Sequence, residues 1–191
     1  MLIQVMRQMG MRFRTWGGKR RGAGRKPEGE RAGVPHVERE VLKARFPVHV
    51  TWRMEKGVWS LRTRRCFGPM KRAMYSGAVK NGFRLVHYAV MGNHVHLIVE
   101  AQDRVKLATG MQGLGVRIAK ALNRVMRRHG RVIGDRYHAH ILKTPSEVKR
   151  ARHYLLTNAQ HHYAHAHGDD FVSQAPLVAP RTWLMLRAGT S

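Results

Sequence analysis

The feature that most constrains the fold is a pair of apolar segments joined by Gly92 and Asn93. The first segment, 83–91, reads FRLVHYAVM, and the second, 94–100, reads HVHLIVE. Both are rich in β-branched and aromatic residues, which favour strands. Gly-Asn between two such segments is typical of a tight turn. The sequence therefore predicts an antiparallel hairpin here, the strongest in the chain.

Further elements are expected on both sides of this hairpin. The segment 46–54 (FPVHVTWRM) has the composition of a strand, and 131–144 that of an extended segment. Helices are expected over 70–81, from a cap at Asp103 to about 129, and from Thr144-Pro145-Ser146-Glu147 to about 165. The order β-α-β-β-α-β-α predicts an α+β fold: a ferredoxin-like antiparallel sheet with helices on one face and an added C-terminal helix.

The chain of 191 residues suits one domain with flanking segments. Residues 1–45 are expected to form a basic flexible arm, because 11–31 is rich in Gly, Arg and Lys and has no apolar period. Residues 46–167 are expected to form the folded domain. Residues 168–191 are interpreted as a polar, proline-containing tail with a small apolar patch at 183–186.

The charge of the chain narrows the classes of function. Lys and Arg number 36 and Asp and Glu 11, which gives a net charge of +25 with His neutral. Such a charge argues against an ordinary metabolic enzyme and indicates a polyanionic partner, most often nucleic acid. A hydrophobic content of 43% argues against a wholly disordered basic protein.

Cysteine content and hydropathy bear on the compartment. The single cysteine, Cys66, excludes a disulfide framework and a cysteine zinc site and suits a reducing cytoplasm. No run of about 18 apolar residues occurs, so neither a transmembrane helix nor a membrane partner is expected.

His94 and His96 are the first candidates for chemistry. Residues i and i+2 of a strand point to the same face, so the two imidazoles are expected side by side, with Val95 directed away. Such a pair could bind a metal ion. The motif alone is weak, since the chain has 13 histidines, including the similar pairs His138/His140 and His165/His167. Solvated or core histidines are the alternative.

Tyr154 and Asn158 are the second candidates. They are four residues apart on the last expected helix and therefore share a face. By spacing alone, the tyrosine could be a core residue and the asparagine a surface residue or a cap. The chemical alternative is that Asn158 supplies an oxygen to a metal beside the Tyr154 hydroxyl.

These segments together resemble a known family. From about residue 46 to 161, the chain is similar to the single-tyrosine HUH transposases, and especially to their REP-associated tyrosine transposase branch. The resemblance is carried by FRLVHYAVMGNHVHLIVE, GRVIGDRYHAHILKT and RARHYLLTNA, in that order. Many relatives have Asn-Pro where this chain has Asn158 followed by Ala159, a difference in the helix ending rather than in the chemistry.

The resemblance implies a specific reaction. It implies that His94, His96 and Asn158 bind Mg²⁺ or Mn²⁺ and that Tyr154 is the catalytic nucleophile. The tyrosine would attack a phosphate of single-stranded DNA, leaving a 5′-phosphotyrosine link and a free 3′-hydroxyl, and strand joining could follow without a nucleotide cofactor. The expected partner is single-stranded DNA with hairpin or palindromic repeats, and a homodimer is compatible with the pattern.

Basic residues outside this site are expected to contact DNA. On the long helix, a stripe of cations follows helical spacing, and Arg136 lies in the segment before the last helix. The alternatives are a solvated helix face and, for Arg136, a salt bridge to Asp135. The arm KRRGAGRKP resembles an AT-hook whose Gly-Arg-Pro core is interrupted by Lys26, and a nonspecific phosphate-binding tail is its alternative. The predicted DNA-binding residues are Arg20, Arg21, Arg25, Lys26, Arg117, Lys120, Arg124, Arg127, Arg128 and Arg136.

Two other functions remain open at the level of sequence. One is a non-catalytic, domesticated DNA- or RNA-binding protein with the same fold, and the other is a basic ribosome-associated protein. The combination of His94, His96, Tyr154 and Asn158 favours the transposase, because a pure binding protein would more often carry stacking aromatic residues on its strands.

Overall fold

The computed structural model describes residues 40–162 and 170–181. Contacts divide the chain into residues 1–32 and 33–191, so all described residues belong to the second unit. The arm residues Arg20, Arg21, Arg25 and Lys26 and the apolar patch at 183–186 lie outside the described residues.

The described chain forms a five-stranded antiparallel sheet and three helices. The strand order is β2-β3-β4-β1-β5. Apart from the two-residue edge strand β2, the sheet and the order of its connections are ferredoxin-like, which confirms the predicted fold class. The elements are β1 (Val48–Arg53), α1 (Arg64–Ser76), β2 (Val79–Lys80), β3 (Phe83–Val90), β4 (His94–Ala101), α2 (Arg104–Met126), β5 (His138–Ile141) and α3 (Pro145–His162).

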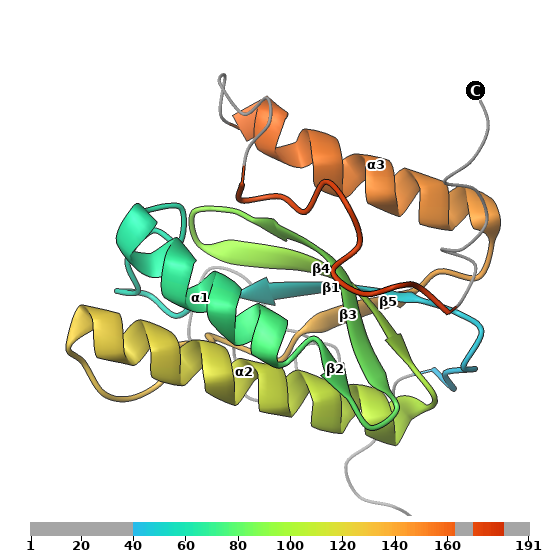
Figure 1. Ribbon diagram of the computed structural model, residues 1–191, viewed down its shortest axis with the longest axis horizontal. Coiled ribbons are helices and arrows are strands. Elements are labelled where there is room, and N and C mark those ends of the chain that lie inside the picture. Colours follow the sequence, from blue (N-terminus) through green and yellow to red (C-terminus); the bar gives the residue numbers. More distant parts are fainter. Residues whose placement is uncertain (1–39, 163–169, 182–191) are drawn as a thin grey trace, which may run out of the picture. The chain divides into compact units, whose positions relative to one another are not determined.

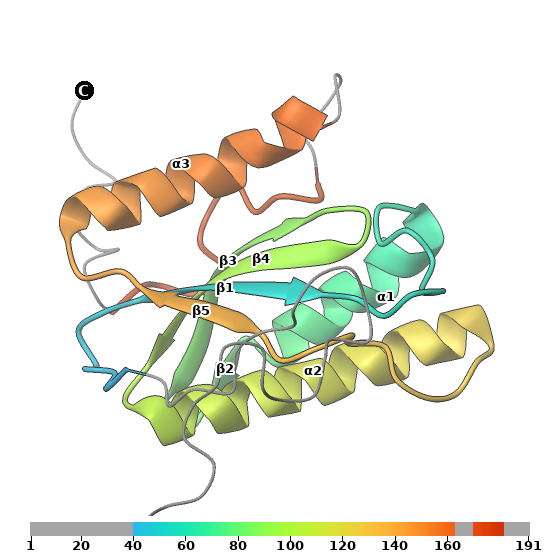
Figure 2. The same cartoon turned by 180° about the vertical axis from the view of Figure 1, so that it is seen from behind.

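The helices cover opposite faces of the sheet (Figures 1 and 2). α1 and α2 pack together on one face, and α3 lies on the other against β3 and β4. On β4, Val95 and Leu97 face the main core beneath α1 and α2, whereas Ile98 joins a second apolar cluster beneath α3. Because side chains alternate along a strand, His94 and His96 share the α3 face with Ile98.

A bulge in β3 allows this strand to contribute apolar side chains both to the main core and to the cluster beneath α3. The register with β4 shifts between Leu85 and His87. As a result, Leu85 and Tyr88 both lie in the main core despite their odd spacing, and Ala89 lies in the cluster beneath α3. An extra residue in one strand has this effect because it reverses the alternation beyond it.

Helix α2 approaches the sheet closely at two glycines. A Cβ at Gly110 would lie 2.1 Å from Cγ of Phe83, and one at Gly115 would lie 2.5 Å from the Trp52 ring. By its intrinsic propensity, a glycine within a helix, such as Gly115, weakens that helix. Its place in the fold follows from packing, since any side chain here would push the helix off the sheet.

Three helix boundaries differ from the sequence predictions. α1 ends at Ser76 rather than at 81, and β2 (Val79–Lys80) lies within the range that was expected to be helical. α1 begins at Arg64 rather than 70, because the Thr63 side chain caps it by accepting from the Cys66 N–H, and Pro69 lies inside the helix. α2 ends at Met126, where Arg127 adopts a left-handed conformation (φ 51°). No helix among residues 40–162 and 170–181 is long and apolar enough to cross a membrane.

Helix α3 begins where the sequence predicts, in a reciprocal cap. The Glu147 carboxylate accepts from the Thr144 N–H at 3.0 Å, and the Glu147 N–H donates to Thr144 Oγ1 at 3.2 Å. The carboxylate also accepts from the Lys143 N–H, and these backbone donors lower the pKa of Glu147. This cap fixes the start of the helix that carries Tyr154.

Residues 170–181, which the sequence interpretation placed in the tail, pack against the sheet. The Val90 N–H donates to the Phe171 carbonyl at 2.8 Å, and the Ser173 N–H donates to the Tyr88 carbonyl at 3.0 Å. Since β2 pairs only with the start of β3, this segment covers the backbone groups that the rest of β3 would otherwise expose. Apolar Phe171 and Val172 supply the packing. Two apolar residues are too short a pattern to predict a strand or a helix.

Candidate active site

The two histidines of β4 lie together at the start of the strand. Their ring centroids are 4.9 Å apart and their planes nearly perpendicular, at 87°. His94 follows directly on the turn at Gly92 and Asn93, whose carbonyls accept from the Leu61 and Met54 N–H groups at 2.8 and 2.9 Å. These bonds tie the turn to neighbouring backbone, so the histidine pair is held on a rigid part of the fold.

Each histidine is oriented through its Nδ1 atom. His94 Nδ1 lies 2.8 Å from Oδ1 of Asn93, and His96 Nδ1 lies 3.1 Å from Oγ1 of Thr51. An amide oxygen can only accept, so His94 carries its proton on Nδ1. If His96 likewise donates to Thr51, both rings present an Nε2 lone pair. This is the tautomer with which histidine binds a metal through Nε2 while its other nitrogen is held by a protein group.

Tyr154 contacts this pair from α3. Its ring centroid lies 5.2 Å from that of His96, with the planes at 88°. The side chain is 43% exposed, while His96 is only 5% exposed. The next residue, Leu155, is buried with Val148 and Ala151 beneath α3, and these contacts fix the rotation of the helix on the sheet. The arrangement places an accessible phenol beside a buried imidazole.

Asn158 lies one turn after Tyr154, on the buried face of α3. It is 5% exposed, and its Nδ2 atom has no hydrogen-bond partner among the described residues. Its burial excludes the alternative of a surface residue. Within the described ranges, no group of three His, Cys, Asp or Glu is arranged to hold a metal ion. The amide oxygen of Asn158 is of a type that Mg²⁺ and Mn²⁺ accept as a ligand.

The site includes two further side chains that the sequence analysis did not identify. His49 and Thr51 lie on β1 and face α3, and Thr51 is paired in register with His96. His49 is stacked on His96, with centroids 5.4 Å apart, and lies edge-on to Tyr154 at 6.0 Å. Burial, with contributions from His140 and His138, lowers the pKa of His49 to about 4, so this ring is neutral at pH 7. The sequence feature that could have identified His49 and Thr51 is their spacing of two residues in the expected strand, within the stretch HVT.

The other tyrosines of the described residues lie elsewhere. Tyr88 and Tyr137 are buried in the main core, where Tyr137 packs edge-on against Trp52. Tyr75 is exposed on α1, on the opposite face of the sheet. Tyr163 lies outside the described residues. Among the residues described, Tyr154 alone is an exposed tyrosine in contact with the histidine pair.

Comparison with known proteins places this arrangement in a family. Residues 43–158, more than half of the chain, match the family model for IS200-like transposases. The chain belongs to the IS200-like transposase family. The matched range ends at Asn158 and includes both histidines and Tyr154.

One solved structure agrees with this assignment at the level of the fold. A REP-associated tyrosine transposase bound to a REP hairpin matches with a TM-score of 0.54 and 14% identity, over 68% of this chain and 75% of that one. A presumed transposase of Deinococcus radiodurans R1 matches with a TM-score of 0.43 and 17% identity, over 64% of this chain and 94% of that one. No curated protein matches the sequence.

The predicted DNA-binding face of α2 in this transposase borders a basic groove. The groove, about 540 Å³, lies between α1 and α2, and four of its lining residues are cations: Arg72, Arg117, Lys120 and Arg124. No acidic side chain lines it. α1 and α2 cover the face of the sheet opposite α3 (Figure 1). The groove, which is lined by α1 and α2, and Tyr154 of α3 therefore lie on different sides of the sheet.

The predicted stripe of cations does not continue past Lys120 and Arg124. Arg127 and Arg128 follow the end of α2, and the left-handed conformation of Arg127 takes the chain off the helical path. Arg128 instead donates to the Arg131 carbonyl at 2.8 Å. The prediction of one continuous helical stripe was therefore wrong, because it assumed that the helix extends to 129. Arg136 is exposed before β5, and its backbone N–H donates to Asp135.

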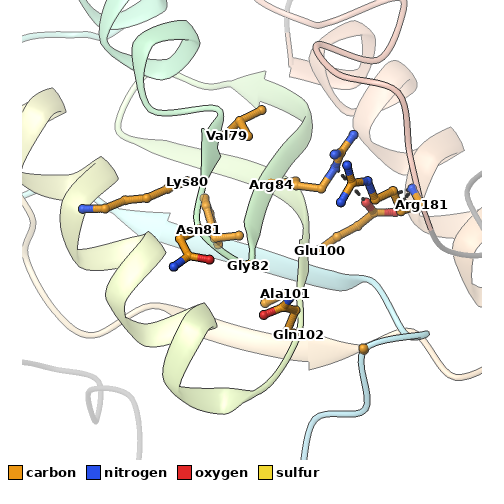
Figure 3. A pocket seen from close by; sticks show the side chains of 11 residues that line it. Val79, Lys80, Asn81, Gly82, Arg84, Glu100, Ala101, Gln102 and Arg181 are labelled. Atoms are coloured by element: carbon orange, nitrogen blue, oxygen red, sulfur yellow. Dashed lines mark hydrogen bonds and ion pairs between the residues drawn. The ribbon is translucent and has the colours of Figure 1, made fainter.

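A second cavity of about 580 Å³ lies beside the β2–β3 turn (Figure 3). The Glu100 carboxylate in its wall accepts from the Arg181 N–H at 2.9 and 3.0 Å and lies 3.4 Å from Nε of Arg84. Glu100 shares a strand face with His94 and His96, yet its partners are these arginines. Its carboxylate joins residues 170–181 to the sheet.

Proposed function

We propose that this transposase cleaves and rejoins single-stranded DNA through a covalent link to Tyr154. The observation that carries the proposal is the contact of an exposed Tyr154 ring with buried His96 at 5.2 Å, in a chain of the IS200-like family. A nucleophile on a helix whose cap and apolar face are fixed is held in a defined position for attack.

The reaction follows from the chemistry of a phenol and a phosphodiester. The Tyr154 oxygen attacks the phosphorus, the bond to the 3′ oxygen breaks, and the phenolic proton leaves to solvent, from which the 3′ oxygen takes one. The products are a 5′-phosphotyrosine and a free 3′-hydroxyl. Attack by a 3′-hydroxyl on the phosphotyrosine is the same reaction in reverse, so joining needs no nucleotide cofactor.

The donor atoms of the site suit a divalent cation. His94 and His96 through Nε2, and Asn158 through its amide oxygen, would hold Mg²⁺ or Mn²⁺. When bound, such a cation would neutralise negative charge that develops on the scissile phosphate during attack. The contacts of Thr51 and Asn93 keep the two imidazoles in the required orientation.

Basic residues are proposed to bind the remainder of the DNA. The groove cations face each other across α1 and α2 with no acid in the lining, and they suit a phosphate backbone. The sheet separates the groove from Tyr154, so a DNA that contacts both must pass around the sheet. Arg127, Arg128, Arg136 and the arm residues Arg20, Arg21, Arg25 and Lys26 are proposed to add phosphate contacts.

The test is formation of a covalent adduct. Hairpin oligonucleotides with single-stranded flanks, taken from the sequence beside the gene, are incubated with the protein and Mg²⁺ or Mn²⁺ and resolved under denaturing conditions. A 3′-end label is expected to remain with the protein and a 5′-end label to appear on a shorter free strand.

The control variants separate chemistry from binding. Tyr154→Phe is expected to bind the DNA and form no adduct, whereas Tyr75→Phe, at an exposed tyrosine of α1, is expected to react normally. An adduct formed by Tyr154→Phe would refute the assignment. DNA binding by the wild-type protein without any adduct would favour the non-catalytic binding protein.

A further inference from the structure

The site contains a third imidazole that lies between strand and helix. His49 of β1 is paired in register with Ile98 of β4 and His140 of β5, so its side chain points to the α3 face. There it stacks on His96, with centroids 5.4 Å apart and planes at 30°. The same ring lies 6.0 Å from that of Tyr154, with planes at 66°.

These contacts close a triangle of rings. His96 and Tyr154 are themselves 5.2 Å apart at 88°, so His49, His96 and Tyr154 each contact the other two. All three centroid separations fall in the range of favourable aromatic pairs. Tyr154 is the only corner of the triangle on a helix, and the two imidazoles come from adjacent strands.

The triangle matters because the nucleophile is partly exposed. A tyrosine with 43% of its surface in solvent has room to change rotamer unless neighbouring groups restrict it. His49 and His96 both restrict the Tyr154 ring on the side toward the sheet. The stack with His49 also supports the plane of His96, which Thr51 contacts at Nδ1.

We propose that His49 is a positioning residue that holds the Tyr154 and His96 rings in their reactive orientation through the surface of its own ring. The inference rests on the proposed function, because it assigns a role toward that nucleophile. Nε2 of His49 is buried and has no hydrogen-bond partner among the described residues, so ring contact rather than a polar bond from Nε2 accounts for its place. His49 is not assigned as a metal ligand.

The kinetic test compares two substitutions of His49. Single-turnover adduct formation is measured over a range of DNA concentrations, which separates the maximal rate from the half-saturating concentration. His49→Ala is expected to lower the maximal rate about tenfold or more, since small displacements of reacting groups cost large factors in rate, and to leave half-saturation unchanged. His49→Phe keeps a ring and is expected to retain the rate within about threefold. The matched control His129→Ala, at an exposed loop histidine, is expected to behave as wild type.

A second readout needs neither metal nor activity. In the metal-free, isotopically labelled protein, nuclear Overhauser contacts between the Tyr154 and His96 rings are expected in the wild type and His49→Phe. They are expected to weaken or vanish in His49→Ala, while its backbone amide spectrum stays folded.

The outcomes distinguish the inference from the function on which it rests. A wild-type rate for His49→Ala, or ring contacts that persist in it, would overturn the positioning role. Equal loss of rate in His49→Phe and His49→Ala would show that a nitrogen acts instead of the ring. If the wild-type protein forms no adduct at all, the proposed function fails, and the ring contacts alone decide whether His49 orders Tyr154.

Discussion

Oγ1 of Thr51 lies 3.1 Å from Nδ1 of His96, across the register that pairs β1 with β4. The hydroxyl sets the orientation of an imidazole that would bind a metal through its other nitrogen. Thr51→Val keeps the shape of the side chain and removes the hydroxyl, and it is expected to weaken Mn²⁺ binding by about tenfold or more. Free Mn²⁺ measured by electron paramagnetic resonance gives the affinity.

A second threonine provides the control for this measurement. The Thr109 hydroxyl of α2 donates to the Val105 carbonyl one turn earlier, in the helix layer on the other face of the sheet. Thr109→Val is therefore expected to bind Mn²⁺ as the wild type does. Equal affinities for Thr51→Val and Thr109→Val would show that the Thr51 contact does not orient a ligand.

Asn158 is expected to lower the stability of the metal-free protein and to contribute a ligand to the metal. Its amide Nδ2 is buried without a hydrogen-bond partner among the described residues, which is unfavourable for folding. Asn158→Leu removes this unpartnered polar group at nearly constant side-chain size and is expected to raise the free energy of unfolding of the metal-free protein by about 1 kcal/mol. The same variant is expected to lose Mn²⁺ binding. Urea denaturation measures the change in stability, and the Mn²⁺ titration measures the change in metal affinity. An unchanged metal affinity would show that Asn158 is not a ligand.

The basic groove is expected to contribute to DNA affinity without affecting the chemistry. Lys120→Ala with Arg124→Ala removes two groove cations and is expected to weaken binding of a hairpin oligonucleotide. The slope of log affinity against log salt should fall by about 0.7 to 0.9 per lost phosphate contact. Adduct formation at saturating DNA is expected to persist. The double variant Lys43→Ala with Lys56→Ala removes the same charge from exposed positions outside the groove, and an equal effect from it would show that only net charge matters.

Residues 170–181 are expected to stabilise the sheet. The Phe171 ring lies 4.3 Å from that of Phe67, and the Arg62 guanidinium lies over its face. Phe171→Ala is expected to lower the free energy of unfolding by about 2 kcal/mol, less than for a fully buried phenylalanine. Phe171→Leu, which keeps most of the apolar volume, is expected to lose less. Identical denaturation curves for the wild type and Phe171→Ala would mean that the segment does not hold the edge of β3.

Stability is expected to fall in mild acid through His87. Burial, with the nearby Arg152 charge, lowers its pKa from 6.5 to about 4, and its Nδ1 lies 3.2 Å from Oγ of Ser173. Between these two pH values the unfolded chain takes up a proton that the native state does not, so stability decreases as the pH falls through this window. The loss from this residue is at most about 3 kcal/mol.

The control for this prediction is a residue that cannot titrate. His87→Asn keeps a polar group toward Ser173, and its stability is expected to fall less than that of the wild type between pH 7.5 and 4.5. Chemical denaturation at the two pH values measures the difference. Parallel losses in both proteins would assign the acid sensitivity to other groups.

The sequence alone determined the features that depend on neighbours along the chain. Strand alternation predicted that His94 and His96 share a face, helical spacing put Tyr154 and Asn158 one turn apart, and Thr144 to Glu147 predicted the start of α3. These follow from local geometry, in which a few residues decide the conformation. The order of the elements was then sufficient for the ferredoxin-like class. Predictions from local sequence were wrong where a distant or competing contact set the helix boundary, as at the start of α1 and the end of α2.

Only the tertiary structure decided which distant residues meet. His49 and Thr51 join the site because the register of β1 with β4 places them there, and a shift of one residue would turn both to the other face. The close packing of α2 at Gly110 and Gly115, the groove on the face opposite Tyr154 and the segment that covers β3 have the same origin. Strand register and helix packing are settled by burial summed over the whole domain, and no short stretch of sequence contains that sum.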